Sequence, residues 1–153
     1  MKSDAVVEPA TIEDLSELTE LVVDLMGLQA DFHPDSQRQE DGIRAILEEP
    51  ARGRIFVVRA HDRIVGMANL LFTVSTAMGG FVIIMEDVII HPEQRGRGFG
   101  SLLLEAVIQF SEEKGFKRIT LLADKLSNES QSFFQQHGFN FSSLIPMRLI
   151  LDS

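Results

Sequence analysis

The residues best suited to chemistry lie in one short stretch, His91 to Gly100, which reads His-Pro-Glu-Gln-Arg-Gly-Arg-Gly-Phe-Gly. An apolar, strand-like run precedes it and a helix-like run follows, so the glycines are predicted to lie at a helix start. A helix start leaves about four backbone N–H groups unpaired and carries roughly half a positive charge. Glycine permits a tight turn and close approach to a ligand, and Arg95 and Arg97 add forked donors. The stretch therefore indicates a cradle for an anion, most naturally a phosphate or pyrophosphate.

Other interpretations of the glycine-rich stretch can be tested on its letters. A tight turn with solvated arginines is the simplest alternative. A phosphate-binding P-loop needs Gly-Lys-Ser/Thr, whereas Gly100 is followed by Ser101 and Leu102. A dinucleotide fingerprint needs G-x-G-x-x-G, and serine occupies position 101 where the third glycine is required. Asp124 nevertheless lies at roughly the distance of the acidic residue in that fingerprint, so a nucleotide-binding oxidoreductase stays an alternative.

A pair of carboxylates, Glu86-Asp87, interrupts the apolar run Phe81 to Ile90. Burying an ionised carboxylate is costly unless it is paired, and desolvation in general raises a carboxyl pKa toward the range useful to a general base. With the two-residue period of a strand, Glu86 is predicted to share a face with Val88 and Ile90. Asp87 is then predicted to face the opposite side. The structural alternative is a carboxylate satisfied by an arginine or a backbone cap.

The amino-acid composition excludes several classes of protein. The chain has 153 residues, of which 44% are hydrophobic and 24% charged, which predicts one domain over residues 1–153. The absence of cysteine excludes disulfides and a cysteine nucleophile, and the histidine spacing predicts no metal site. A net charge of −9 argues against nucleic-acid binding and favours a neutral or cationic partner. With no signal-peptide core and no membrane-length apolar run, we expect a cytoplasmic protein without a membrane partner.

Hydrophobic periodicity predicts a mixed-sheet α/β (α+β) fold with the element order β-α-α-β-β-β-α-β-α-β-β. Three consecutive strands are expected to form an antiparallel meander whose last member is central, and the strand-helix-strand unit after it implies a parallel pairing. The predicted strands are Ala5–Glu8, Arg54–Ala60, Ile64–Val74, Phe81–Ile90, Arg118–Ala123, Phe139–Ser142 and Pro146–Leu151. The predicted helices are Ile12–Gly27, Ser36–Glu48, Ser101–Lys114 and Ser127–His137. Thr11 with Asp14 predicts a capping box, and Gly115 a left-handed helix end.

The stretch Arg95-x-x-Gly98-x-Gly100 matches the acyl-CoA signature Gln/Arg-x-x-Gly-x-Gly/Ala of the GNAT superfamily of N-acetyltransferases. The element order is similar to that of this family along essentially the full chain. Phe133-Phe134-x-x-x-Gly138-Phe139 also resembles the family's Phe-Tyr-x-x-x-Gly-Phe ending. The resemblance implies a GNAT-like acyl-CoA N-acyltransferase fold and acetyl-CoA as cofactor, with coenzyme A as product.

The resemblance also implies roles for individual residues. The strand backbone before the glycine turn would face pantetheine and the thioester, and the N–H groups of the turn would hold the pyrophosphate. Glu86 would be the catalytic base that deprotonates the acceptor amine. The implied cofactor-binding residues are Val88, Ile89, Ile90, Arg95, Gly96, Arg97, Gly98, Phe99, Gly100, Ser101, Asn128 and Phe134. Asn128 has an alternative role as a helix N-cap. Weaker substrate-side candidates are Phe32, His33 and Asp35.

The implied activity is transfer of an acetyl group to a primary amine of a small molecule or peptide, by direct attack in a ternary complex. The acidic composition hints at a cationic acceptor, and because dimers are common in the family a homodimer is one expected assembly. The chain departs from the family in having no tyrosine. Phe134 occupies the place of the tyrosine that protonates the leaving thiolate, so a water or the Ser130 hydroxyl would serve, or the thiolate would leave unprotonated. This departure keeps open a second function, a catalytically weak or inactive acyl-CoA-binding sensor or scaffold.

Overall fold

A computed structural model describes residues 5–26 and 34–152 of the chain. Two of the substrate-side candidates, Phe32 and His33, lie outside the described residues. The chain forms two compact units, Met1–Leu122 and Ala123–Ser153, and each is described by itself. Among the helices of the described ranges, none is long and apolar enough to cross a membrane.

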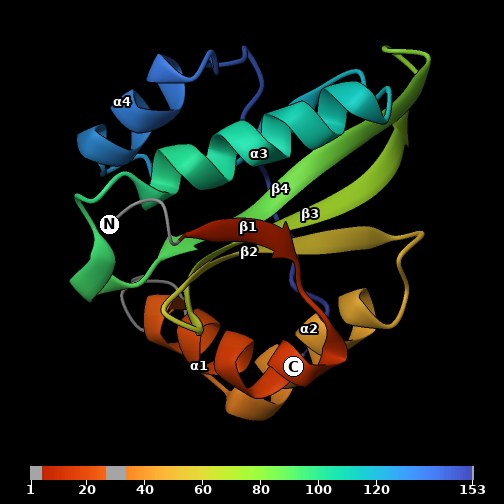
Figure 1. Cartoon of the computed structure of the whole chain (residues 1–153). Coiled ribbons are helices and arrows are strands. Elements are labelled where there is room, and N and C mark those ends of the chain that lie inside the picture. The colour runs from red at the N-terminus through yellow and green to blue at the C-terminus, as the bar shows by residue number, and fades with distance from the viewer. Residues whose placement is uncertain (1–4, 27–33, 153) are drawn as a thin grey trace. The chain divides into compact units, whose positions relative to one another are not determined.

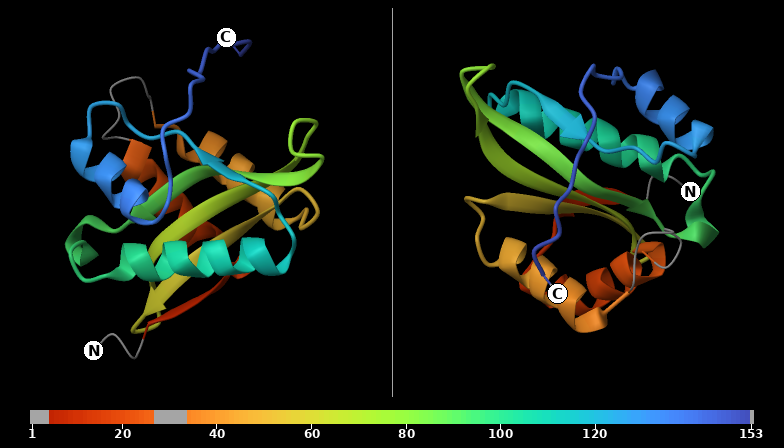
Figure 2. Two further views of the ribbon diagram at one scale, coloured as in Figure 1. Left: turned by 90° about the horizontal axis from the view of Figure 1, so that it is seen from above. Right: turned by 180° about the vertical axis from the view of Figure 1, so that it is seen from behind.

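The first unit is a five-stranded sheet with helices on both faces (Figures 1 and 2). The strands follow the order β1-β2-β3-β4-β5, and all neighbours are antiparallel except the parallel pair β4 and β5. The predicted meander and the parallel pairing are therefore confirmed, whereas the third strand of the meander lies fourth of five and is an interior strand only from Ile83 to Met85. The strands are β1 (Val6–Pro9), β2 (Gly53–Ala60), β3 (Arg63–Ser75), β4 (Gly80–Ile90) and β5 (Ile119–Leu121). The helices of this unit are α1 (Leu15–Met26), α2 (Ser36–Leu47), α3 (Phe99–Glu113) and the short 3-10 helices η2 (Ile12–Asp14) and η3 (Pro92–Gln94).

Each face of the sheet has its own apolar core. On one face the helical spacing of apolar residues in α1 and α2 places them against alternate residues of the strands. That cluster consists of Leu15, Leu18, Leu21, Val22, Ile43, Ile55, Val57, Ile64, Met67 and Ile89. On the other face the ring of Phe110 in α3 lies 5.0 Å from Phe56 and 6.2 Å from Phe72, centroid to centroid. Such aromatic pairs add about 0.5–1.5 kcal/mol each beyond the area they bury. The middle of the sheet is thus fixed from both sides.

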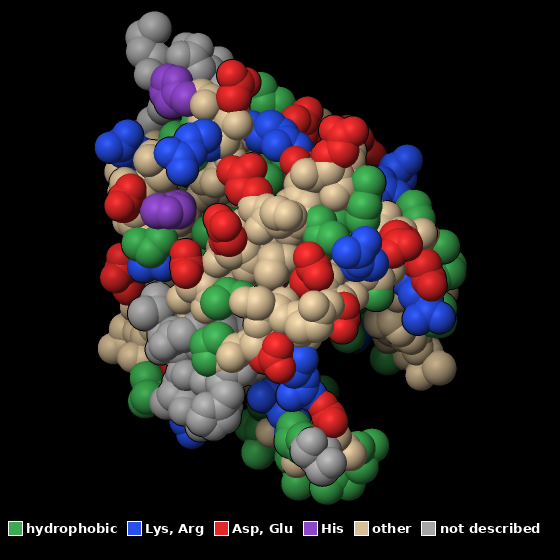
Figure 3. Space-filling model, turned by 90° about the horizontal axis from the view of Figure 1, so that it is seen from below, with side chains coloured by type: hydrophobic (Ala, Val, Ile, Leu, Met, Phe, Trp, Pro, Cys, Tyr) green, Lys and Arg blue, Asp and Glu red, His purple; other side chains and the backbone are tan. Residues whose placement is uncertain are grey.

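Acidic and basic side chains are interspersed over the face that carries α1 and α2 (Figure 3). The net charge of −9 is therefore not gathered into one patch on that face.

The second unit contains α4 (Asn128–Gln136). The two closing strands predicted at Phe139–Ser142 and Pro146–Leu151 are wrong, because the described part of this unit has no strand after α4. Large apolar side chains in the segment, such as Leu144 and Met147, are more than four-fifths exposed, at 82% and 91%. Alternation of apolar residues produces a strand only where a partner strand pairs with it.

A partly buried ionic cluster, centred on the buried Asp14, ties η2 to the first two strands. The Thr11 N–H donates to Asp14 Oδ2 at 2.9 Å, which confirms the predicted capping box. Asp14 also accepts from Arg59 Nη2 at 2.6 Å, and Arg59 Nε donates to Glu8 Oε1 at 2.6 Å. Burial has the largest single effect on Asp14 and raises its pKa, but the hydrogen bonds from Arg59 and Thr11 outweigh it and leave the pKa below its ordinary value. The cluster therefore stabilises the fold when Asp14 is ionised.

We expect the Arg59→Met variant to lose about 3 kcal/mol of unfolding free energy at pH 7, because Asp14 would remain buried without its cation. A depressed folded-state pKa contributes stability above the unfolded value of about 3.9, and that stability is lost as the pH falls through the folded value. Urea unfolding at a series of pH values should show that the unfolding free energy falls more steeply toward acid pH in wild type than in Arg59→Met.

Arg52→Met is the matched control, because Arg52 and its partner Glu49 are exposed, with 78% and 54% of their side chains accessible. That variant should change stability by about 0.5 kcal/mol or less. Equal losses in the two variants would contradict the role given to the cluster around Asp14.

Candidate functional site

The glycine turn leads directly into α3. Gly98 is the N-cap with φ 85°, and Gly96 has φ 79°, so both occupy the left-handed region that favours glycine. The N–H of Leu102 donates to Gly98 O at 3.1 Å, which makes Gly98 the first acceptor of the helix. The helix begins at Phe99, two residues before the predicted start at Ser101. The first N–H groups of α3 have no acceptor within the helix and are therefore available to an anion.

Side chain and backbone hydrogen bonds hold this turn against the end of β4. Arg95 Nε donates to Ile90 O at 3.1 Å, and the His91 N–H donates to Val65 O at 2.7 Å. His91 Nδ1 accepts from the Glu93 N–H at 3.3 Å. The turn and the last residues of β4 therefore form one connected structure.

Among the residues that the structure describes, the second half of β4 pairs with a strand on one side only. Its pairing with β3 continues to Ile90, whereas β5 pairs with it only from Ile83 to Met85. The backbone of Val88, Ile89 and Ile90 therefore lies along an edge that β5 does not cover. Such an edge presents N–H and C=O groups that can pair with an extended ligand.

A β-bulge marks the point where the pairing with β5 stops. Leu70 of β3 pairs with Met85, and the next residue, Asn69, pairs with Asp87, so Glu86 is the extra residue of β4. Two residues of a bulged strand then oppose one residue of its partner. The predicted unbroken alternation through Glu86 is therefore wrong, although Asp87 still lies on the opposite face from Val88. Glu86 itself is exposed.

Asp87 and Asn69 form a polar pair inside the sheet. Asn69 is buried, and its Nδ2 donates to Asp87 Oδ2 at 3.2 Å. Burial raises the pKa of Asp87, the hydrogen bond from Asn69 lowers it, and the charge of Glu86 raises it, so that the pKa lies above its ordinary value. Sequence reasoning missed Asn69, although a lone amide within the apolar run Ile64 to Leu71 was a usable signal.

Gly66 allows β3 to approach the end of β4 closely, since it pairs with Ile90. A Cβ at this position would lie 2.5 Å from Ile90 Cδ1 and 2.9 Å from Ile89 O. We expect Gly66→Ala to lower the unfolding free energy by about 1–3 kcal/mol through overpacking. Gly42→Ala in α2 is the matched control, because a Cβ there meets nothing within 4 Å. It should raise stability by about 0.8–1.0 kcal/mol, and a loss of stability in both variants would contradict the close approach at Gly66.

The remaining predicted site residues have local structural roles. Ser127 is the N-cap of α4 and accepts from the Ser130 N–H at 3.2 Å, so the cap is Ser127 and Asn128 is the first helical residue. Phe134 is buried, with its ring 5.9 Å from that of Phe139 in the same unit. Asp35 caps α2 by accepting from the backbone N–H groups of Gln37 and Arg38 at 3.1 and 3.4 Å.

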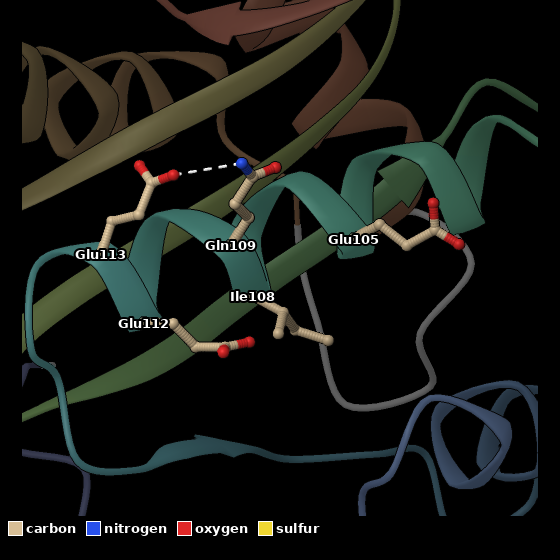
Figure 4. Close-up of a pocket in the computed structure, with 5 residues that line it drawn as sticks. All are labelled: Glu105, Ile108, Gln109, Glu112 and Glu113. Atoms are coloured by element: carbon tan, nitrogen blue, oxygen red, sulfur yellow. Dashed lines mark hydrogen bonds between the residues drawn. The ribbon is translucent and has the colours of Figure 1, made fainter.

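A shallow hollow on the outer surface of α3 does not include the glycine turn (Figure 4). Gln109 Nε2 donates to Glu113 Oε1 at 3.1 Å along its rim. Its lining residues are Glu105, Ile108, Gln109, Glu112 and Glu113. The three carboxylates would repel a phosphate-bearing ligand, so the hollow is not the anion cradle.

Residues 17–139 match the family described as the Acetyltransferase (GNAT) family. The chain belongs to this family. The predicted GNAT fold and the enzyme class are confirmed by this match, which replaces the oxidoreductase alternative.

Other GNAT proteins similar to this chain carry more specific names. It is 26% identical over 105 residues to the uncharacterized N-acetyltransferase YhfO of Bacillus subtilis (strain 168), covering 69% of this chain and 70% of that protein. It is 31% identical over 87 residues to a glucosamine 6-phosphate N-acetyltransferase of Trypanosoma brucei brucei, covering 56% of this chain and 57% of that protein. Its fold is similar to that of the aminoglycoside N-acetyltransferase AAC(6')-Iy in complex with CoA, with a TM-score of 0.80 at 17% identity, covering 97% of this chain and 95% of that chain.

Proposed function

We propose that this GNAT protein transfers the acetyl group of acetyl-CoA to a primary amine of a small molecule or peptide within a ternary complex. The observation that carries the proposal is the junction of the glycine turn with the uncovered edge of β4. One part offers N–H groups to a pyrophosphate and the other offers a strand edge to an extended, amide-containing arm. Coenzyme A contains a pyrophosphate that is linked directly to an extended, amide-containing arm.

Binding of acetyl-CoA is assigned to the two parts of this junction. In the proposal, the N–H groups from Arg95 to Ser101 hold the pyrophosphate, and the backbone of Val88, Ile89 and Ile90 pairs with pantetheine. The left-handed φ angles of Gly96 and Gly98 support this assignment, because they favour glycine at both positions, and glycine has no side chain to block the approach to the helix start. Asn128 and Phe134 of the second unit are proposed as further contacts of the cofactor.

Glu86 is the proposed general base. Its carboxylate takes a proton from the acceptor ammonium, directly or through a water, and the freed amine attacks the thioester carbonyl carbon. The C–N bond forms, the C–S bond breaks, the electron pair passes to the sulfur of coenzyme A, and the attacking nitrogen loses its second proton to water to become the amide. The exposure of Glu86 at the bulge, where β5 stops pairing with β4, supports this role. Water or the Ser130 hydroxyl protonates the thiolate, or it leaves as the anion, since Phe134 has no proton to donate.

The acceptor is proposed to be cationic because the chain carries a net charge of −9. The names of the similar proteins add an amino sugar phosphate and aminoglycosides as amine classes to test. A suitable panel is glucosamine 6-phosphate, an aminoglycoside, spermidine and a lysine-containing peptide. Release of free thiol from acetyl-CoA that depends on one of these amines would support the proposal.

The absence of tyrosine from the chain favours a second candidate function, an acyl-CoA-binding module with weak or no turnover. Calorimetric titration with acetyl-CoA distinguishes it from the enzyme. Tight binding without amine-dependent thiol release across the panel would favour the binding module. No binding of acetyl-CoA would contradict both functions.

A further inference from the structure

Asn69 has an amide oxygen that its surroundings leave unused. The side chain lies in the middle of β3, between Ile55 of β2 and Asp87 of β4, and the residue is only 6% exposed. Nδ2 donates to Asp87, but Oδ1 is buried without a hydrogen-bond partner among the described residues. A buried acceptor without a donor costs free energy that an apolar side chain of similar size would avoid. The position therefore carries an amide at a cost to stability.

The bulge places this unused acceptor beside the proposed reaction centre. Asn69 opposes both Glu86 and Asp87, and it does so at the level where β5 stops pairing with β4. Neighbouring strands are about 4.8 Å apart, so Asn69 lies one strand away from the edge assigned to the thioester arm. Asp87 is only half-buried, so the Asp87 end of the pair is the part that solvent reaches.

We propose that Asn69 Oδ1 and the Asp87 carboxylate together accept N–H bonds from the amino group of the acceptor and position it for attack. The proposal rests on the proposed function and names the group that the acceptor must carry. Two acceptors side by side fit an amine with at least two N–H bonds. Once Glu86 has taken a third proton from the ammonium, the lone pair of the nitrogen is free to attack. No covalent bond forms to Asn69 or Asp87. The pair should therefore select primary amines over fully substituted ones.

A metal ion fits this pair less well than an amine. Mg²⁺ and Ca²⁺ require six or more oxygen ligands, several of them charged. Within the residues that the structure describes, no group of three or more His, Asp or Glu side chains is placed to hold a metal. One carboxylate and one amide oxygen are instead the kind of acceptor set that a single ammonium group can satisfy.

The first test uses ethylammonium chloride as the probe and NMR of the full chain as the measurement. We expect saturable shifts of the Asn69 side-chain amide and the Asp87 carboxyl carbon. Tetramethylammonium chloride has the same charge and no N–H bond, and it should leave both signals in place. Equal shifts with the two salts, or none with ethylammonium, would overturn the proposal. The absence of any shift with ethylammonium is also the result expected if Asp87 is protonated and donates to Asn69 Oδ1. The two side chains would then use their hydrogen-bonding groups on each other and leave none for an amine.

The second test compares Asn69→Leu with wild type. The variant should melt within a few degrees of wild type, because removing the unpaired buried acceptor offsets the loss of the Nδ2 donor to Asp87, and the response of the Asp87 signal to ethylammonium should weaken. With an amine that is turned over, KM for the amine should rise about tenfold or more, as expected for a lost hydrogen bond to a charged group, with acetyl-CoA affinity unchanged. A lower melting temperature with an intact ethylammonium response would assign Asn69 a purely structural role.

Asn69→Ser keeps the test decisive if the leucine variant does not fold, because serine is smaller and should weaken the ethylammonium response in the same way. A serine variant with a full wild-type response would overturn the proposal. The NMR titrations contain no acetyl-CoA. A protein that responds to ethylammonium but never releases thiol would therefore contradict the proposed function while supporting the amine site.

Discussion

Replacing Gly98 with glutamate is expected to weaken acetyl-CoA binding at least about a hundredfold, because the substitution blocks the helix start and places a negative charge there. Two hydrogen bonds to a charged group, each worth about 1.5–3 kcal/mol, account for a loss of this size. The added carboxylate also lies where the peptide dipoles favour an anion, so it would compete directly with the pyrophosphate. Adding Gly100→Glu should complete the loss. Calorimetric titration with acetyl-CoA measures the effect.

Gly115→Glu provides the matched control at the other end of the same helix. Gly115 has φ 78°, and a Cβ there meets nothing within 4 Å. The substitution therefore imposes a similar backbone strain and the same charge without touching the glycine turn. Its acetyl-CoA affinity should equal that of wild type. If both variants bind acetyl-CoA equally well, the glycine turn is structural and the proposed cofactor site is wrong.

The parts of the site that depend on local chemistry were predictable from sequence. Left-handed glycines, the capping box and the C-terminal glycine of α3 each follow from a few neighbouring residues. Gly115 has the predicted positive φ angle, the predicted tight turn contains Gly96 and Gly98 at positive φ, and Thr11 and Asp14 form the predicted box. The antiparallel meander was equally accessible, because short turns join strands whose apolar residues are continuous.

The parts that depend on pairing between distant residues were not predictable in the same way. The bulge at Glu86 is a property of the register between β3 and β4, and period-two alternation within β4 carries no information about it. Asn69 becomes notable only when Asp87 is seen opposite it. The segment from Phe139 to Leu151 has the alternation of strands, but strand formation requires a partner that alternation does not supply. In all three cases the missing information is the identity of the neighbour across the sheet.

We expect Glu86→Gln to lower kcat, because Glu86, the extra residue of the bulge, is the proposed general base. Glutamine keeps the size and exposure of the side chain but cannot accept a proton from the acceptor ammonium. A general base typically contributes about a hundredfold to ten-thousandfold, so kcat at neutral pH should fall within that range while acetyl-CoA affinity stays constant. The residual rate should rise about tenfold per pH unit below the pKa of the amine, because only the free base attacks. Steady-state kinetics over a pH series measures both features.

Two controls separate proton transfer from other effects at the bulge. Glu93→Gln changes an exposed carboxylate of η3 next to the glycine turn, and it should leave kcat and its pH profile unchanged. Asp87→Asn removes the charge of the residue beside Glu86, and it should raise KM for the amine more than it lowers kcat, because Asp87 is proposed to position the amine. If kcat is unchanged in Glu86→Gln and falls strongly in Asp87→Asn instead, the general base is Asp87 and not Glu86. Because the two carboxylates oppose the same residue of β3, only this KM-against-kcat split can tell which one takes the proton and which one holds the amine.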